Sequence, residues 1–397
     1  MSRFGTRELL IWFRKISVFL IIITIGIASL VSGTDRISSD FPRSPSIEGW
    51  PYDVGAARSR AELALVGTGP ASAMPHAKRA ILSDPLDTNI VGLLGRSRLL
   101  AGDRAAAEAA FRVSGQLGWH DPLTQMYWMD QALILGDTRV AAERLDAVLR
   151  LVPNIENRDT LISILIQTPD GRTELAKRLK LAPPWLGVFV NTLKDVPANQ
   201  VIARAEVLRL AGPGILECNR SSNIVDRLIS ANQLQPALAI WRTNCLSHAS
   251  LVYDGAFDKF DPSRSATGFD WQVSSRGDVD VGMEEPVPGI HNLQLAVNAA
   301  NTLPVLRQVV ALTPGRYRLS WQMPGTSPTA ALAMSSSLDC SPNLGTARAG
   351  QRTNASDGYS LVFVVDAACS SRQLIFWLAP KASVKIANVE LKSLGAE

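Results

Sequence analysis

Histidines and paired carboxylates, which carry much of enzyme chemistry, are sparse in this sequence. Glu284 and Glu285 are adjacent acids in the C-terminal part, and glycoside hydrolysis needs two carboxylates. Neighbouring side chains on an extended chain point in opposite directions, however, so these two would not converge on one substrate. The chain has four histidines, His76, His120, His248 and His291. None of them stands at the spacing of metal ligands. The sequence therefore predicts no metal, no cofactor and no catalytic pair.

Sequence motifs of common enzyme classes are also missing. The chain contains no nucleophile elbow, zinc-protease helix or phosphate-binding loop. Gly67-Thr68-Gly69 lacks both a third glycine and a preceding strand, so it predicts an ordinary turn. We therefore expect a non-enzymatic protein. The alternative is a divergent carbohydrate-active enzyme, whose acids would converge from distant parts of the chain.

The four cysteines all follow the N-terminal apolar segment, and none forms a CxxC pair. An oxidising compartment would pair them. Two lie in the helical region and two in the β region, so we expect Cys218 to pair with Cys245 and Cys340 with Cys369. Each disulfide would stabilise its own domain by roughly 3 kcal/mol through loop closure. The alternative is four free, buried thiols.

An uncharged apolar segment runs from Ile16 to Thr34. As a helix it would be roughly 30 Å long, close to the hydrocarbon thickness of a bilayer. Basic residues outnumber acids upstream, with Arg3, Arg7, Arg14 and Lys15 against Glu8. Such a flank normally stays in the cytoplasm. The sequence therefore predicts a single-pass protein of the bacterial inner membrane, with its C-terminal bulk in the periplasm. A signal peptide cleaved near Val31-Ser32-Gly33 is the alternative, and it would export the same domains.

The composition describes a packed globular protein and argues against a nucleic-acid partner. Hydrophobic residues make up 46% of the 397 residues and charged residues 19%, which excludes wholesale disorder. The net charge of +4 is small, and its basic residues are interspersed with acids. A Ser/Pro-rich stretch at 36–52 predicts a spacer, and the length suits two folded regions after it.

A repeat of 34 residues marks the helical region. Gly102-Asp103 recurs as Gly136-Asp137, and Ala107 recurs as Ala141. The pattern resembles the tetratricopeptide repeat family, whose repeat has this length. The resemblance implies paired helices stacked in a solenoid, continuing in degenerate form beyond Pro153. It also implies a protein partner bound by the first helix of each repeat, and the residues it nominates are Asn89, Arg96, Met126 and Asp130.

After Leu251 short alternating runs separated by Gly, Pro and Asn predict an antiparallel β domain. The segments YDGAF at 253–257, GFDW at 268–271, LTPGRY at 312–317 and VKIANVEL at 384–391 follow in order. This order is similar to jelly-roll carbohydrate-binding modules and galactose-binding-like domains. Many members of that family hold a structural calcium, often with an acid where this chain has Ala387. That difference puts calcium in doubt.

Sugar recognition needs an exposed aromatic face with polar groups beside it. In RYRLSWQM, Tyr317, Leu319 and Trp321 share one face of the strand, and we expect that face to be buried in the core. Arg318 and Gln322 fall on the opposite, wet face. In LIFWL the core face would hold Leu374, Phe376 and Leu378, which leaves Trp377 outward. Trp377, Arg318 and Gln322 are therefore the candidate sugar-binding residues, and burial of Trp377 is the alternative.

The sequence as a whole predicts a multidomain protein with an α-helical region followed by a β domain. We expect an anchor at 1–35, a linker at 36–52, helical repeats at 53–249 and a jelly-roll β-sandwich at 250–397. The expected role is a membrane-anchored periplasmic adaptor in envelope polysaccharide synthesis or export, which binds a protein partner and a polysaccharide. A purely structural assembly protein is the alternative.

Overall fold

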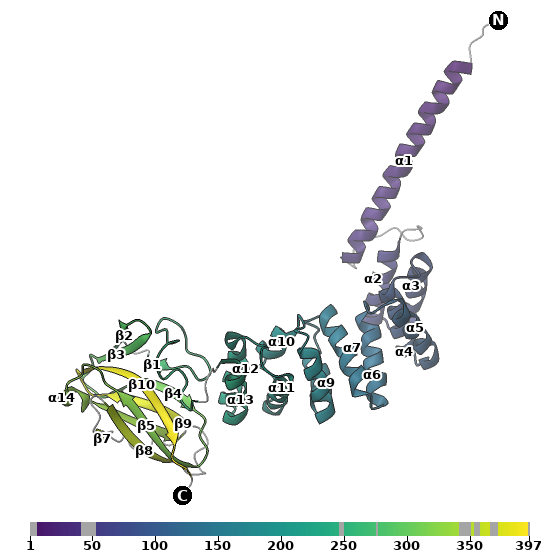
Figure 1. Cartoon of the computed structure of the whole chain (residues 1–397). Helices are drawn as coiled ribbons and strands as arrows, with labels where there is room; N and C mark the ends of the chain where they lie inside the picture. Colours follow the sequence, from purple (N-terminus) through teal and green to yellow (C-terminus); the bar gives the residue numbers. More distant parts are fainter. Residues whose placement is uncertain are drawn as a thin grey trace. The chain divides into compact units, whose positions relative to one another are not determined.

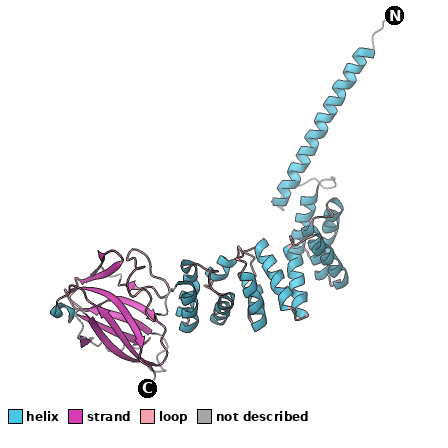
Figure 2. Cartoon of the chain, in the orientation of Figure 1, coloured by secondary structure: helices cyan, strands magenta, loops and turns pink. Residues whose placement is uncertain are grey.

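The computed structural model describes residues 6–40, 53–245, 250–274, 277–340, 351–352, 358–365 and 372–395 of the 397. A helical N-terminal part is followed by two antiparallel sheets (Figures 1 and 2), which confirms the predicted order of α then β. The chain divides into two compact units, Met1–Arg158 and Asp159–Glu397.

The N-terminal helix α1 spans Thr6–Asp40. Within it, Trp12–Ile37 is long and apolar enough to cross a membrane, and little of its surface is buried by the rest of the protein. The helix continues through residues 36–40, which the sequence assigns to the linker. At its last turns, the carboxylate of Asp35 accepts hydrogen bonds from the backbone N–H groups of Gly55 and Ala56, at 3.2 and 2.9 Å. Asp35 thereby caps the first turn of the next helix, α2.

Six shorter helices follow α1 in the described part of the first unit. They pack as consecutive pairs, α2 with α3, α4 with α5 and α6 with α7. Short turns join them, so neighbouring helices run in opposite directions. Their bounds are Val54–Gly67 (α2), Pro70–Ser83 (α3), Thr88–Leu100 (α4), Arg104–Leu117 (α5), Pro122–Ile134 (α6) and Thr138–Leu151 (α7).

The repeat seen in the sequence recurs in the structure. Helices α4 and α6 begin 34 residues apart, as do α5 and α7. Asp103 and Asp137 each cap the following helix by accepting an N–H bond three residues on, and the glycine before each has positive φ. Ala107 and Ala141 are fully buried, which lets the paired helices approach closely.

Six more described helices follow, and the first of them, α8, begins at Arg158, the last residue of the first unit. The second unit begins at Asp159, whereas the sequence changes from a helical to a β pattern near residue 250. Helices α9 to α13 therefore belong to the same unit as the sheets. Contacts of α12 and α13 with the segment after residue 250, described below, give the physical reason. The helices are Arg158–Ile166 (α8), Pro169–Leu179 (α9), Leu186–Asn191 (α10), Ala198–Ala211 (α11), Cys218–Ser230 (α12) and Leu234–Cys245 (α13).

The C-terminal part contains two sheets in which every paired strand is antiparallel. One has the order β1-β4-β9-β6 and the other β2-β3-β10-β5-β8-β7. A short helix, α14 (Pro328–Ala331), lies between β5 and β6. The strands are Gln272–Val273 (β1), Val279–Val287 (β2), Ile290–Val297 (β3), Leu303–Val310 (β4), Gly315–Gln322 (β5), Met334–Cys340 (β6), Gln351–Arg352 (β7), Gly358–Val365 (β8), Arg372–Leu378 (β9) and Ser383–Ser393 (β10).

Side chains of both sheets share one hydrophobic core. The ring of Trp321 on β5 meets Phe376 on β9 edge to face, with centroids 5.6 Å apart, so the two sheets pack against each other. The predicted core faces are confirmed, because Tyr317, Leu319, Trp321, Leu374, Phe376 and Leu378 are all buried. Outward positions on these strands are therefore the ones available to a ligand.

Candidate ligand-binding cleft

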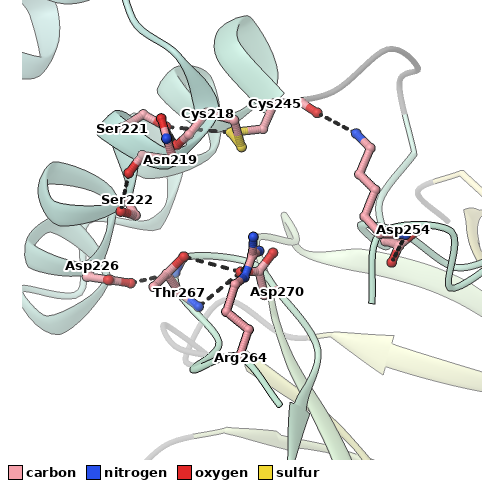
Figure 3. Close-up of polar contacts among 12 residues, drawn as sticks. Cys218, Asn219, Ser221, Ser222, Asp226, Cys245, Asp254, Arg264, Thr267 and Asp270 are labelled. Atoms are coloured by element: carbon pink, nitrogen blue, oxygen red, sulfur yellow. Dashed lines mark hydrogen bonds and ion pairs between the residues drawn. A yellow bond between two sulfur atoms is a disulfide. The ribbon is translucent and has the colours of Figure 1, made fainter. Parts of the chain in front are cut away.

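A cleft of about 680 Å³ lies in the second unit, where α12 and α13 meet the segment that precedes β1. Figure 3 shows these elements facing one another across it. Its volume falls in the range of small-ligand sites. Eleven residues line it: Glu217, Cys218, Asn219, Ser222, Trp241, Tyr253, Lys259, Arg264, Ser265, Thr267 and Asp270.

A disulfide fixes the helical wall of the cleft. Cys218 at the start of α12 is bonded to Cys245 at the end of α13, as the sequence predicts. The ammonium group of Lys259, from the segment before β1, donates to the backbone carbonyl of Cys245 at 3.2 Å. The same ammonium lies 5.4 Å from the ring centroid of Tyr253, within cation–π range. The disulfide thus holds the end of α13 where the β segment contacts it.

Trp241 and Tyr253 contribute aromatic rings to the lining of the cleft. Trp241 of α13 is buried, and its ring centroid lies 5.2 Å from that of Tyr253 and 5.9 Å from that of Phe269. Gly268 has φ +57° and packs against the same indole, where a Cβ would come within 2.5 Å of the ring. Only glycine allows this approach, because it combines left-handed backbone with a missing side chain.

Carboxylates hold the loop that carries Gly268. Asp226 of α12 accepts the backbone N–H of Gly268 at 2.6 Å, and burial raises the pKa of Asp226. Asp270 accepts the backbone N–H of Thr267 at 3.0 Å and its hydroxyl at 3.2 Å. The guanidinium of Arg264 lies 3.5 Å from the same carboxylate. These contacts tie the loop to α12 and to Arg264 within the wall of the cleft (Figure 3).

Two neighbouring side chains have strongly shifted pKa values. Burial raises the pKa of Tyr253 to about 12, so its hydroxyl stays protonated and can donate a hydrogen bond. Among the residues that the structure describes, none hydrogen-bonds that hydroxyl. Burial also raises the pKa of Asp254 to about 6, while the hydrogen bond from the backbone N–H of Lys259 acts in the opposite direction. Asp254 does not line the cleft.

The cleft presents donors and acceptors without a dominant charge. Glu217 and Asp270 are balanced by Lys259 and Arg264, and hydroxyl and amide groups make up much of the remainder. A strongly anionic ligand would find no net attraction here, whereas a neutral ligand with hydroxyl groups would find both donors and acceptors. The arrangement therefore suits binding of a neutral polar molecule.

The residues predicted to bind sugar are divided between the two sheets. Arg318 and Gln322 are exposed on β5, and Gln322 Oε1 accepts a hydrogen bond from Asn388 at 2.7 Å. Trp377 is on β9 in the other sheet, where it is half-buried and donates from its indole N–H to Ser337 Oγ at 2.9 Å. Because the sheets face each other across the core, their outer faces point apart. Trp377 therefore forms no common site with the other two.

The residues predicted to contact a protein partner lie on two neighbouring helices of the first unit. Arg96 on α4 and Asp130 on α6 are exposed, and these helices touch. Met126 is partly exposed, and the side-chain amide of Asn89 donates to Asp87 at the start of α4. Docking of a protein partner by these four residues stays a prediction.

The remaining sequence predictions concern cysteines and calcium. The predicted pair of Cys340 and Cys369 lies outside the residues whose side chains are described. Ala387 is buried on β10 and supplies no ligand oxygen from its side chain. Within the described ranges, no group of three His, Cys, Asp or Glu side chains could hold a metal ion.

Most cleft residues were not singled out from the sequence. Of the lining residues, Cys218 has a predicted role, in the disulfide with Cys245, and the segments YDGAF and GFDW belong to the resemblance to carbohydrate-binding modules. Both segments in fact lie in loops before or at β1. Their unusual density of Gly, Asp and aromatic residues was the available signal, since these types are frequent in loops that form binding sites.

No family model matches the sequence, and no curated protein matches it. Among solved structures, the enzymatically active domain of tailspike protein 4 of bacteriophage CBA120 aligns with 39% of this chain and 23% of its own, at 16% identity and a TM-score of 0.27. TmCBM61, in complex with β-1,4-galactotriose, aligns with 37% of this chain and 99% of its own, at 16% identity and a TM-score of 0.26. With TM-scores this low, neither likeness assigns a ligand to this chain.

Proposed function

We propose that this protein is a non-enzymatic, membrane-anchored adaptor of the periplasm that binds a neutral polysaccharide in the cleft of its second unit. The observation that carries the proposal is the lining of the cleft. It combines charge-balanced polar side chains with the hydroxyl of Tyr253, whose pKa burial raises to about 12 and which no described residue hydrogen-bonds. Sugars are bound in this way, by many hydrogen bonds of both directions at a site with aromatic walls.

The rigidity of the cleft supports binding. The disulfide, the packing of Gly268 on Trp241 and the carboxylate contacts of Asp226 and Asp270 order the walls before a ligand arrives. A preorganised site loses less conformational entropy on binding. Anchoring through α1 and docking of a protein partner by the first unit complete the proposed adaptor, with a role in envelope polysaccharide synthesis or export.

The test is retention of neutral oligosaccharides by the full chain in detergent, with acidic oligosaccharides as a second panel. We expect Tyr253→Phe, which removes one hydroxyl and keeps the ring, to weaken retention about fivefold, the effect of roughly 1 kcal/mol from one hydrogen bond. Tyr359→Phe is the control, since Tyr359 is buried in the same unit but does not line the cleft. A folded protein that retains no neutral oligosaccharide would exclude the sugar-binding role.

Trp377→Ala separates the two possible locations of a sugar. If sugar binds in the cleft, Trp377→Ala leaves retention unchanged, because Trp377 does not line the cleft. Loss of retention in Trp377→Ala but not in Tyr253→Phe would instead place the site on the outer face of the sheet that contains β9.

A divergent carbohydrate-active enzyme is the second candidate, and the position of Glu217 favours it. Glu217 is exposed at the start of α12 and lines the cleft together with Asp270. No described residue hydrogen-bonds its carboxylate. Prolonged incubation with the retained oligosaccharide decides between the candidates. Cleavage products that disappear in Glu217→Gln would identify an enzyme, and an unchanged oligosaccharide supports the adaptor.

A further inference from the structure

The helices of the first unit end at two opposite edges. We call the edge where α2, α4 and α6 begin the proximal edge, and it includes the turns at 84–87 and 118–121. The distal edge holds the turns at 68–69, 101–103 and 135–137, where these helices end. The edges differ in one respect that concerns a membrane, namely that α1 is attached to the proximal edge.

The attachment of α1 is short and specific. Its apolar stretch ends at Ile37, and Asp35, two residues earlier, hydrogen-bonds the first turn of α2. If α1 spans a bilayer, the last turn of the apolar stretch lies at the bilayer surface. The start of α2 then lies at that surface too, because a single hydrogen-bond length separates the two.

Large apolar side chains project from the proximal edge. Leu82 and Leu86 flank the turn between α3 and α4 and are 86% and 72% exposed. Trp119, in the next turn along this edge, is 46% exposed. Exposed apolar residues are common when single, but here they recur in successive turns of the edge that carries α1.

Basic side chains accompany the apolar ones. Lys78 is exposed four residues before Leu82, on the same face of α3. Arg36 is exposed beside Ile37, and the guanidinium of Arg144 lies 3.9 Å from the ring centroid of Trp119. The turn that contains Leu86 also holds two acids, Asp84 and Asp87. Leucine, tryptophan and basic residues together are typical of segments that lie in the headgroup layer of a membrane.

From these observations we propose that the proximal edge inserts into the headgroup layer of the bilayer that α1 spans, so that its occupant is a phospholipid surface. The proposal rests on the membrane anchoring in the proposed function. Leu82, Leu86 and Trp119 enter the boundary between headgroups and acyl chains, while Lys78 and Arg36 contact lipid phosphates. The first unit would then be held against the membrane at two places, by α1 and by this edge.

The distal edge provides the comparison. Val66, Leu100, Ile134 and Leu135 are exposed apolar residues at the distal ends of α2, α4 and α6. Exposed apolar side chains therefore occur at both edges, and the attachment of α1 is what distinguishes the proximal one. Ile134 and Leu135 lie at the far end of α6. A helix of 13 residues is roughly 20 Å long, so they would be well outside the headgroup layer.

The test uses the full chain reconstituted in vesicles of phosphatidylethanolamine and phosphatidylglycerol in equal parts. A photo-crosslinking side chain replaces Leu86, Leu82, Leu135 or Phe19, one at a time, and lipid adducts are detected by mass spectrometry. All four positions are exposed, so the replacements do not disturb the core. We expect adducts with lipid at Leu86, Leu82 and Phe19 and none at Leu135.

The position in α1 separates this proposal from the anchoring on which it rests. Adducts at Phe19 without adducts at Leu86 and Leu82 would overturn the insertion of the proximal edge and leave the anchor in place. Absence of adducts at Phe19 as well would overturn the anchor. Equal adducts at Leu86 and Leu135 would show lipid contact that does not depend on the edge, and this outcome would also overturn the proposal.

Discussion

The indole ring of Trp241 lies against the backbone of Gly268, so closely that a Cβ at position 268 would come within 2.5 Å of the ring. This contact joins α13 to the segment that precedes β1. The contact lies within the compact unit Asp159–Glu397 and brings a helix of that unit against the segment that lines the cleft.

Gly268→Ala should therefore destabilise the second unit by about 3 kcal/mol, because an added methyl overpacks the ring and left-handed backbone disfavours alanine. Gly325→Ala is the control. Gly325 has a similar φ of +64°, but open space surrounds the position of its Cβ, so only the backbone cost of about 1 kcal/mol applies. Thermal unfolding followed by tryptophan fluorescence measures both. Equal destabilisation by the two substitutions would contradict tight packing at Trp241.

The disulfide between Cys218 and Cys245 should contribute substantially to the stability of the second unit. It closes a loop with a sequence separation of 27, for which loop-closure entropy predicts about 3–4 kcal/mol. The double variant Cys218→Ser/Cys245→Ser should unfold at lower temperature than the wild type without any reductant. Reductant should lower the melting temperature of the wild type more than that of the double variant. Wild-type stability in the double variant would contradict the assignment.

Local patterns in the sequence were sufficient to predict the order of elements and the inward faces of the strands. Asp103 and Asp137 each precede a helix and follow a glycine, and Tyr317, Leu319 and Trp321 alternate with polar residues. Each signal comes from neighbouring residues, so it does not depend on the rest of the fold. These features are present in the structure as capped helices and buried strand faces.

The cleft could not be predicted in the same way. Its residues come from α12, α13 and the segment before β1, and no periodicity links Asn219, Trp241 and Thr267. The contact of Gly268 with Trp241 is a tertiary one, and its only trace in the sequence is a glycine in an aromatic segment. Alternation predicted that Arg318 and Gln322 point away from the core, and both are exposed, whereas Trp377 is half-buried. Sugar binding by these residues stays a prediction, because alternation does not show which sheet each strand joins.

The pKa of Asp254 gives the stability of the second unit a dependence on pH. Burial raises this pKa from 3.8 to about 6, so the folded protein binds this proton more tightly than the unfolded chain. Stability contributed by Asp254 is therefore fully present below pH 3.8 and is lost as the pH rises to about 6. Asp254→Asn should stabilise the protein at neutral pH by roughly 1–2 kcal/mol, a value reduced for solvent screening at a partly exposed carboxyl.

Melting temperatures of the wild type and Asp254→Asn between pH 4 and 8 check this dependence. The difference between the two proteins should grow as the pH rises and then level off. Asp261→Asn is the control with the opposite sign, because a hydrogen bond from Ser263 lowers the pKa of Asp261. That substitution should not stabilise at neutral pH. A constant difference between wild type and Asp254→Asn across the range would exclude titration of Asp254 as its cause.

The guanidinium of Arg204 is fully buried, and its charge is balanced by Asp159. Arg204 Nη2 lies 2.6 Å from Asp159 Oδ1, and Nη1 donates to the carbonyl of Phe189 at 3.0 Å. Asp159→Ala should cost about 2–3 kcal/mol, since it removes a carboxylate that contacts a buried cation, and the side chain of Asp159 is itself partly exposed. Arg204→Met removes the cation that makes this loss costly. The double variant should therefore be more stable than the sum of the single effects predicts.

Chemical denaturation of the two single variants and the double variant gives the coupling energy. Glu206→Ala is the control, because the ion pair of Glu206 with Arg209 is exposed and its loss should cost less than about 1 kcal/mol. Strict additivity of Asp159→Ala and Arg204→Met would show that the pair is not coupled. A positive coupling would establish that this ion pair fixes α11 to the start of α8, the helical layer on which α12, α13 and the cleft are built.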